Sequence, residues 1–214
     1  FCGDLTDCNT TSLVLRLGWT SDTRESLLFA NKGVLQRLTG EMGLPGLDLE
    51  YYKIGYKHSW YKDVTKNIVL LLNGEAGYAH SYANSEYPFW KNYYVGGVGT
   101  VRGYQTGSIG PHEIENGNDV AVGGTTQLVG NAEIFFPVPG LKDSKQFRLS
   151  VFVDTGSVWA EDATISLGDL RHSAGIGVSW YSPFGPIKLV LAKALNAQSQ
   201  DQTQILQFQC GSQF

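Results

Sequence analysis

The chain has 214 residues and a formal net charge of −4, and this mild negative charge argues against a nucleic-acid-binding surface. It is rich in glycine (26 residues) and aromatic residues (12%) but poor in charged residues (17%), which is unusual for a soluble domain. The mean hydropathy is slightly polar, and no apolar run approaches the roughly 18 residues of a spanning helix. If the chain spans a membrane, it must therefore do so as a β-barrel.

The N-terminal segment holds two of the three cysteines. Cys2 and Cys8 are a candidate small disulfide loop in an oxidising compartment, and the alternative of two free thiols stays open. The third cysteine, Cys210, stands alone, and the spacing of the three matches no zinc motif, so no metal site is predicted. The chain begins at Phe1 without an initiator methionine or an export signal, and we expect it to be a piece of a longer precursor.

Strands with two different faces recur along the chain. In residues 13–19, Leu15, Leu17 and Trp19 alternate with Arg16 and Gly18, which is the period-two pattern of a strand. The same pattern predicts nine strands, at 13–19, 34–44, 52–60, 68–78, 127–136, 147–156, 174–180, 187–193 and 206–214. The predicted fold class is therefore all-β, with an antiparallel sheet.

The connections between these strands differ in length. Short turns are predicted at 44–47, 62–65, 139–142 and 183–186, and long connections at 81–124 and 160–171. Outer-membrane barrels combine short periplasmic turns with long extracellular loops and carry aromatic girdles at both interfaces. A soluble β-sandwich also alternates, but it gives no reason for tyrosine and tryptophan at so many strand ends. We therefore expect a transmembrane β-barrel whose closure needs residues from outside these nine strands.

The long connection contains an arginine among glycines, in the stretch Gly96-Gly97-Val98-Gly99-Thr100-Val101-Arg102-Gly103-Tyr104. Because glycines permit tight turns and close approach, the loop at about 81–124 is expected to fold into the barrel lumen. A guanidinium confined there needs carboxylate partners. Strand parity proposes Glu133 and Asp154, which lie on the polar faces of their strands. The alternative is that these two carboxylates only hydrate the lumen.

The last predicted strand, 206–214, is amphipathic and ends in an aromatic residue. Phe208, Cys210 and Phe214 are expected on the outer, lipid-facing side, and Gly211 on the inner side. Gly211 has no side chain to pack, so it is expected to weaken the strand locally.

No catalytic constellation is evident in the sequence. His58, His80, His112 and His172 are scattered, and neither a Gly-x-Ser-x-Gly elbow nor a His-Glu-x-x-His motif occurs. Arg102 also occupies a position that a dinucleotide fingerprint reserves for glycine. We therefore expect neither an enzyme nor a cofactor site.

Three motifs in order carry a family resemblance. Val101-Arg102-Gly103-Tyr104 resembles the Val-Arg-Gly-Phe/Tyr signature of the BamA-type outer-membrane assembly proteins and their two-partner-secretion relatives. Ala132-Glu133-Ile134-Phe135 and Val153-Asp154-Thr155-Gly156 are similar to the segments in which that family carries a Glu and an Asp. The resemblance implies that Arg102 reaches the wall carrying Glu133 and Asp154.

The resemblance also implies an organisation. The family has a sixteen-stranded barrel preceded by soluble periplasmic repeats, and residues 1–214 match only the C-terminal part of that barrel. The early strands and the repeats are not in this sequence. Residues 205–214 resemble the terminal β-signal strand of the family, with Phe208, Gly211 and Phe214 as the residues that carry the resemblance. In the family, this strand also forms a seam with the first strand.

The function implied by the resemblance is the assembly and insertion of β-barrel proteins into the bacterial outer membrane, by edge-strand templating and local disturbance of the bilayer. The implied partners are unfolded outer-membrane proteins, accessory lipoproteins of an assembly complex and outer-membrane lipid, with no nucleic acid and no cofactor. The alternative is a two-partner-secretion pore that exports a polypeptide. A plain porin is disfavoured, because it has no reason to keep the arginine loop and both matching carboxylates.

Overall fold

The computed structural model describes residues 11–26, 29–82, 87–115, 117–138, 146–183 and 185–211. Its elements are β1 (Val14–Asp22), β2 (Gly33–Gly43), β3 (Tyr51–Thr65), β4 (Ile68–Ser81), η1 (Phe89–Lys91), β5 (His112–Glu115), β6 (Asn118–Ala121), β7 (Thr126–Phe136), β8 (Phe147–Trp159), η2 (Leu167–Asp169), β9 (Arg171–Ser182), β10 (Gly185–Ala194) and β11 (Leu206–Cys210). Within these ranges, no helix is long and apolar enough to cross a membrane.

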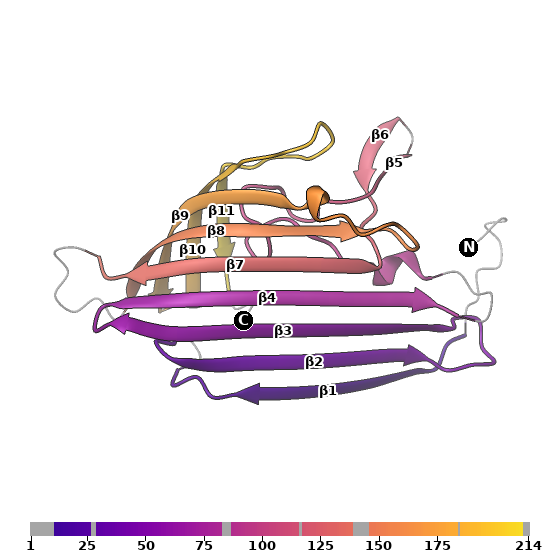
Figure 1. Cartoon of the computed structure of the whole chain (residues 1–214), viewed down its shortest axis with the longest axis horizontal. Helices are drawn as coiled ribbons and strands as arrows, with labels where there is room; N and C mark the ends of the chain where they lie inside the picture. The colour runs from indigo at the N-terminus through magenta and orange to yellow at the C-terminus, as the bar shows by residue number, and fades with distance from the viewer. Residues whose placement is uncertain are drawn as a thin grey trace.

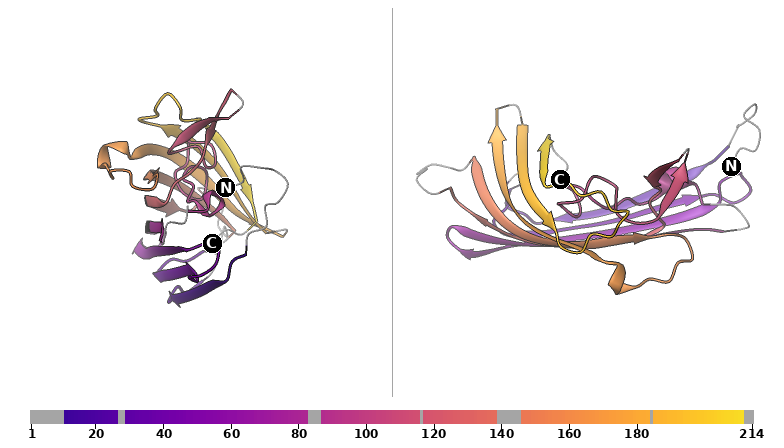
Figure 2. Two further views of the ribbon diagram at one scale, coloured as in Figure 1. Left: turned by 90° about the vertical axis from the view of Figure 1, so that its right-hand side faces the viewer. Right: turned by 90° about the horizontal axis from the view of Figure 1, so that it is seen from above.

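Nine strands form one antiparallel sheet in the order β1-β2-β3-β4-β7-β8-β9-β10-β11, which confirms the predicted all-β sheet of nine strands. The remaining two, β5 and β6, pair as a separate hairpin within the long connection, and the sequence pattern did not predict them. Figures 1 and 2 show the sheet curved into an open trough. Over the described residues β11 does not pair with β1, so the barrel is not closed.

The two faces of the sheet differ as the alternation predicts. On β8, Val151 and Val153 are exposed on the outer face, whereas Ser150 and Asp154 are buried on the inner face. On β1, the outward Leu17 is 68% exposed. Large apolar side chains exposed over a whole sheet face are unfavourable in water but suit a lipid environment. The outer face therefore has the character of a membrane-facing barrel wall.

The turns differ from the prediction in two places. β3 continues through Thr65 and turns at residues 66–67, so the turn predicted at 62–65 is wrong. The ladder between β3 and β4 shifts register between Asp63 and Thr65, and this irregularity carries the strand past the polar residues that suggested a turn. At the other site, β10 already begins at Gly185, within the turn predicted at 183–186. The turn predicted at 139–142 lies outside the described residues.

The connections also alternate between the two ends of the sheet, as they must in an antiparallel meander. Those that follow β1, β3, β7 and β9 lie at one end, and those that follow β2, β4, β8 and β10 lie at the other. The short connection predicted at 44–47 follows β2, so it lies at the end of the long loops. The expectation that all short turns share one end is therefore wrong for this connection.

The long connection between β4 and β7 lies on the concave side of the sheet, as Figure 2 shows. Val95, Val101, Tyr104 and Ile109 of this loop are fully buried and pack against apolar residues of β7 and β8. Burial of these side chains removes apolar area from water and stabilises the loop against the wall. The loop is therefore part of the folded core of the chain.

Candidate functional site

The tip of the long loop is a compact turn formed around two glycines. Gly97 N donates a hydrogen bond to Val101 O at 3.1 Å, which closes the turn. Gly96 has a φ of +120°, and a Cβ at this position would lie 2.4 Å from the carbonyl oxygen of Gln105. Only glycine fits there without strain. The turn places Arg102 next to the inner face of β7 and β8.

Arg102 is anchored by two carboxylates. Its Nε and Nη2 donate to the two carboxylate oxygens of Asp154, each at 2.7 Å, and its main-chain N donates to Asp154 Oδ2 at 3.0 Å. Its Nη1 donates to Glu133 Oε2 at 2.8 Å. All three side chains are at most 3% exposed. Bidentate pairing of this kind offsets the free energy lost when buried charges leave water.

The electrostatic surroundings keep Arg102 charged. Burial by itself would lower the pKa of the guanidinium, but the hydrogen bonds to Asp154 and the charge of Glu133 raise it above its ordinary value. Lys188 of β10 adds a second cation, since its Nζ lies 3.5 Å from Glu133 Oε2. Arg102 and Lys188 therefore both contact the same oxygen of Glu133.

Two further residues complete the contacts around Arg102. The ring of Phe152 on β8 lies under the guanidinium, with its centroid 3.3 Å from Arg102 Cζ, in a cation–π contact. Asn131 Nδ2 on β7 donates to Asp154 Oδ1 at 2.9 Å and to the main chain of the loop. The sequence pattern predicted neither residue as a partner, although each lies two positions from a predicted carboxylate on the same strand face. Lys188 had no such signal, because it is 55 positions from Glu133.

Tyr104, the last residue of the motif, is fully buried, and its hydroxyl donates to His172 O at 3.2 Å. Next to His172, Arg171 forms a second buried ion pair, with its Nε 2.5 Å from Asp201 Oδ2. This pair holds the connection between β10 and β11 against β9. The sequence pattern gave no sign of this pair, because the two residues lie on different elements 30 positions apart.

The motif also meets the last strand. The side-chain amide of Gln207 on β11 accepts from Gly103 N at 3.1 Å and donates to Tyr104 O at 2.7 Å. Of the positions marked on this strand, Phe208 is 63% exposed on the outer face. Gly211 follows the strand with a φ of +96°. Three predicted site residues, namely Phe214, Cys2 and Cys8, lie outside the described residues, so their expected roles stay predictions.

The segment that precedes the motif, residues 91–93, is anchored on the opposite half of the sheet. Lys91 Nζ donates to Glu41 Oε1 of β2 at 2.5 Å, and Glu41 Oε2 accepts from Arg16 Nε of β1 at 2.7 Å. Lys53 Nζ of β3 lies 3.9 Å above the ring of Tyr93. The loop is therefore linked to both halves of the sheet. Glu41 and Lys53 link it to β1, β2 and β3, and the motif links it to β7, β8 and β11.

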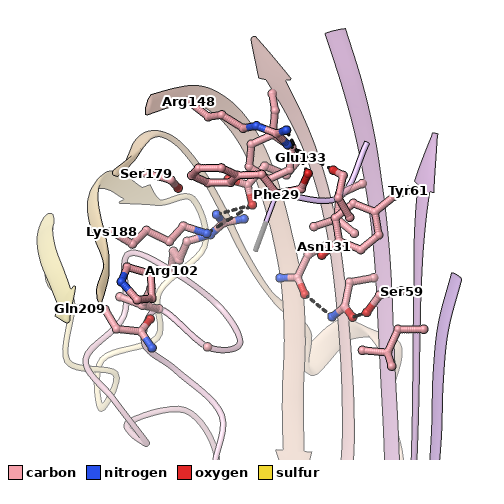
Figure 3. A pocket seen from close by; sticks show the side chains of 18 of the residues that line it. Phe29, Ser59, Tyr61, Arg102, Asn131, Glu133, Arg148, Ser179, Lys188 and Gln209 are labelled. Atoms are coloured by element: carbon pink, nitrogen blue, oxygen red, sulfur yellow. Dashed lines mark hydrogen bonds and ion pairs between the residues drawn. The ribbon is translucent and has the colours of Figure 1, made fainter. Parts of the chain in front are cut away.

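A cavity of about 210 Å³ lies between the loop tip and the connection that follows β1. Figure 3 shows Arg102, Glu133 and Lys188 together in this cavity, with Arg148 beside Phe29. Arg148 of β8 donates to the carbonyl oxygens of Phe29 and the next residue, at 3.2 Å each, so it holds that connection inside the trough. In the described ranges, His, Cys, Asp and Glu side chains form no group of three or more that could hold a metal ion.

An antiparallel sheet with an apolar outer face, a polar inner face and an inner loop held by buried ion pairs defines part of a transmembrane β-barrel. The chain belongs to the Omp85 superfamily, whose domain model matches residues 4–214.

Individual relatives agree with this assignment. The chain is 36% identical over 224 residues to the outer membrane protein assembly factor BamA of Neisseria meningitidis serogroup B, covering 92% of this chain and 28% of that protein. It is 26% identical to a SAM50-like protein of Schizosaccharomyces pombe, covering 80% of this chain and 38% of that protein. The chain thus spans well under half of these relatives, which are not named as enzymes.

A solved structure shows the same fold. The crystal structure of BamA from Haemophilus ducreyi lacking POTRA domains 1–3 matches with a TM-score of 0.83 and 30% sequence identity. The match covers 91% of this chain and 41% of that chain. The nine-stranded trough therefore corresponds to part of the barrel of that protein.

Proposed function

We propose that the full-length protein containing this chain is an assembly factor that folds and inserts β-barrel proteins into the bacterial outer membrane. The observation that carries the proposal is the anchoring of Arg102 by Asp154 and Glu133 inside the sheet of an Omp85-superfamily domain. A barrel that served only as a sieve would gain nothing from an interior loop that is tied to both halves of the wall.

The mechanism of such a protein rests on hydrogen bonding between strands and involves no covalent step. A strand edge presents unpaired N–H and C=O groups, on which another chain can add as a strand. In the described residues β11 pairs only with β10, and it spans five residues against the ten of β10. Few hydrogen bonds hold this strand, so its other edge is the proposed place for an incoming strand. The seam positions would be Phe208, Gly211 and Phe214.

The proposed partners follow from this mechanism. They are unfolded outer-membrane proteins with their own terminal β-signal, accessory lipoproteins of an assembly complex, and the outer-membrane lipid that the apolar outer face meets. The protein needs no cofactor, metal, nucleic acid or catalytic residue for this activity. Its localisation would be integral to the outer membrane.

The role proposed for the arginine loop is to hold the barrel in a shape that is competent for the assembly of other barrel proteins. Arg102, Glu133 and Asp154 would hold the loop against the wall, and the glycines of the motif allow the close approach. Loss of the brace should therefore impair assembly while leaving most of the strand content intact.

The test is to reconstitute the full-length protein in liposomes and to follow the folding of an added unfolded barrel protein. Variants Arg102→Ala and Glu133→Ala are compared with Arg37→Ala, an exposed arginine on β2 that forms no ion pair among the described residues. We expect the wild-type protein and Arg37→Ala to accelerate folding, and both brace variants to do so less.

Two outcomes would overturn parts of this proposal. No acceleration by the wild-type protein, together with robust ion conductance, would favour the two-partner-secretion pore that exports a polypeptide. Acceleration that Arg102→Ala and Glu133→Ala leave unchanged would keep the assembly function and remove the bracing role.

A further inference from the structure

The arginine loop and the segment that leads into β11 share a short stretch of main-chain pairing. Tyr104 forms an isolated antiparallel bridge with Thr203. Next to this bridge, Gln204 N donates to Gly103 O at 2.9 Å. The main chain of the motif is therefore hydrogen-bonded to the segment just before β11.

Gln207 extends this pairing with its side chain. Its Oε1 accepts from Gly103 N and its Nε2 donates to Tyr104 O, and the residue is 4% exposed. A primary amide offers one acceptor group and N–H donors, as a peptide unit does, so the side chain takes the place of a peptide group in the ladder. Because Gln207 is buried, each unmade bond would leave a buried polar group unsatisfied.

Residues 102–104 of the loop are also bonded to the wall of the sheet, on the side away from β11. Arg102, directly before Gly103, is bonded through its side chain and its main-chain N to Asp154. Three consecutive residues of the loop therefore connect the wall formed by β7 and β8 to the last strand. β11 has only five ladder positions with β10, so two additional hydrogen bonds are a substantial part of what holds it.

We propose that Gln207 is a positioning residue that couples the arginine loop to β11. Docking of Arg102 holds the Gly103–Tyr104 main chain in place, and that main chain holds Gln207 and the strand. Release of the loop then loosens β11 and frees its outer edge for an incoming strand. This inference rests on the proposed function, in which strand exchange takes place at β11.

The test uses the folded full-length protein and measures amide hydrogen exchange in two segments, 101–105 and 206–210. Gln207→Leu removes both amide bonds at similar volume. Gln209→Leu is the matched control, on the same strand and the same face, since Gln209 forms no side-chain hydrogen bond to other described residues. Arg102→Ala is the third variant, because Arg102 makes no hydrogen bond to β11.

We expect exchange in both segments to rise about tenfold in Gln207→Leu, from the loss of two buried hydrogen bonds, and to stay unchanged in Gln209→Leu. Arg102→Ala should also speed exchange in 206–210 about tenfold, which a purely local role of Gln207 would not produce. If Gln207→Leu does not fold, Gln207→Met, which keeps the unbranched shape and also removes both bonds, replaces it and should raise exchange in both segments by a similar factor.

Unchanged exchange of 206–210 in Arg102→Ala would overturn the coupling, as would a Gln207→Leu effect confined to 101–105. Assembly of an added barrel protein is measured on the same wild-type sample. Failure of that assay would refute the proposed function, whereas the exchange data decide the coupling on their own.

Discussion

Asp154 accepts three hydrogen bonds from Arg102, two from the guanidinium at 2.7 Å and one from the main-chain N at 3.0 Å. Glu133 accepts one from Arg102 at 2.8 Å and also lies near Lys188. Asp154 therefore holds both the side chain and the main chain of the loop, whereas Glu133 holds the side chain alone. The two carboxylates are unequal anchors.

The first prediction follows from this inequality. Asp154→Asn turns one acceptor oxygen into a donor against the guanidinium and should lower the free energy of unfolding by about 3 kcal/mol. Glu133→Gln keeps an acceptor for Arg102 and should lower it by about 1–2 kcal/mol. Denaturant unfolding of the full-length protein in micelles measures both, with the exposed Asp63→Asn as control. Equal losses for the two substitutions would contradict the assignment of Asp154 as the main anchor.

The second prediction concerns the ring beneath the guanidinium. Phe152→Leu removes the cation–π contact with Arg102 while keeping an apolar side chain, and should lower the free energy of unfolding by about 1–2 kcal/mol. Phe208→Leu on the outer face, 63% exposed, should change it by about 0.5 kcal/mol at most. A double-mutant cycle with Arg102→Met separates the contact from general packing. A coupling energy of zero between Phe152 and Arg102 would show that the ring only fills space.

The third prediction concerns the turn at the loop tip. Gly96→Ala forces a Cβ to within 2.4 Å of a main-chain oxygen at a φ of +120°, so it should destabilise the docked loop by about 1–3 kcal/mol. Gly74→Ala on β4 is the control, because a Cβ there meets nothing within 4 Å. Limited proteolysis should cleave the loop faster in Gly96→Ala alone. Similar cleavage of both variants would mean that the turn tolerates a side chain.

The fourth prediction concerns the far anchor of the loop. Lys91 and Glu41 are 2.5 Å apart and are 23% and 17% exposed, so their interaction is only partly screened. A double-mutant cycle of Lys91→Met and Glu41→Gln should give a coupling energy of about 1 kcal/mol in unfolding. The effects of Lys91→Met and Arg102→Ala should be nearly additive, because the two anchors lie on different halves of the sheet. Strong non-additivity would show that the loop docks as one cooperative unit.

Much of the wall could be predicted from local pattern. The alternation of residues 147–156 put Val153 outside and Asp154 inside, and β8 has both there. A strand pleat has a period of two residues, so the face of a side chain is a local property of the sequence. The same pattern failed at residues 62–65, where polar residues continue β3 through an irregular ladder. It also missed the β5–β6 hairpin, whose short strands lie inside the long connection.

The sequence by itself determined the nine strands of the main sheet and, through strand parity and the motif around Arg102, which carboxylates were candidates to meet the loop. Only the tertiary structure decided the rest of the site. Gln207 meets Gly103 across 104 positions of the chain, and Lys91 meets Glu41 across 50. Such contacts depend on how far the sheet curves and where the loop crosses it. Curvature and loop path result from packing between distant elements, and the period of a single strand carries no information about them.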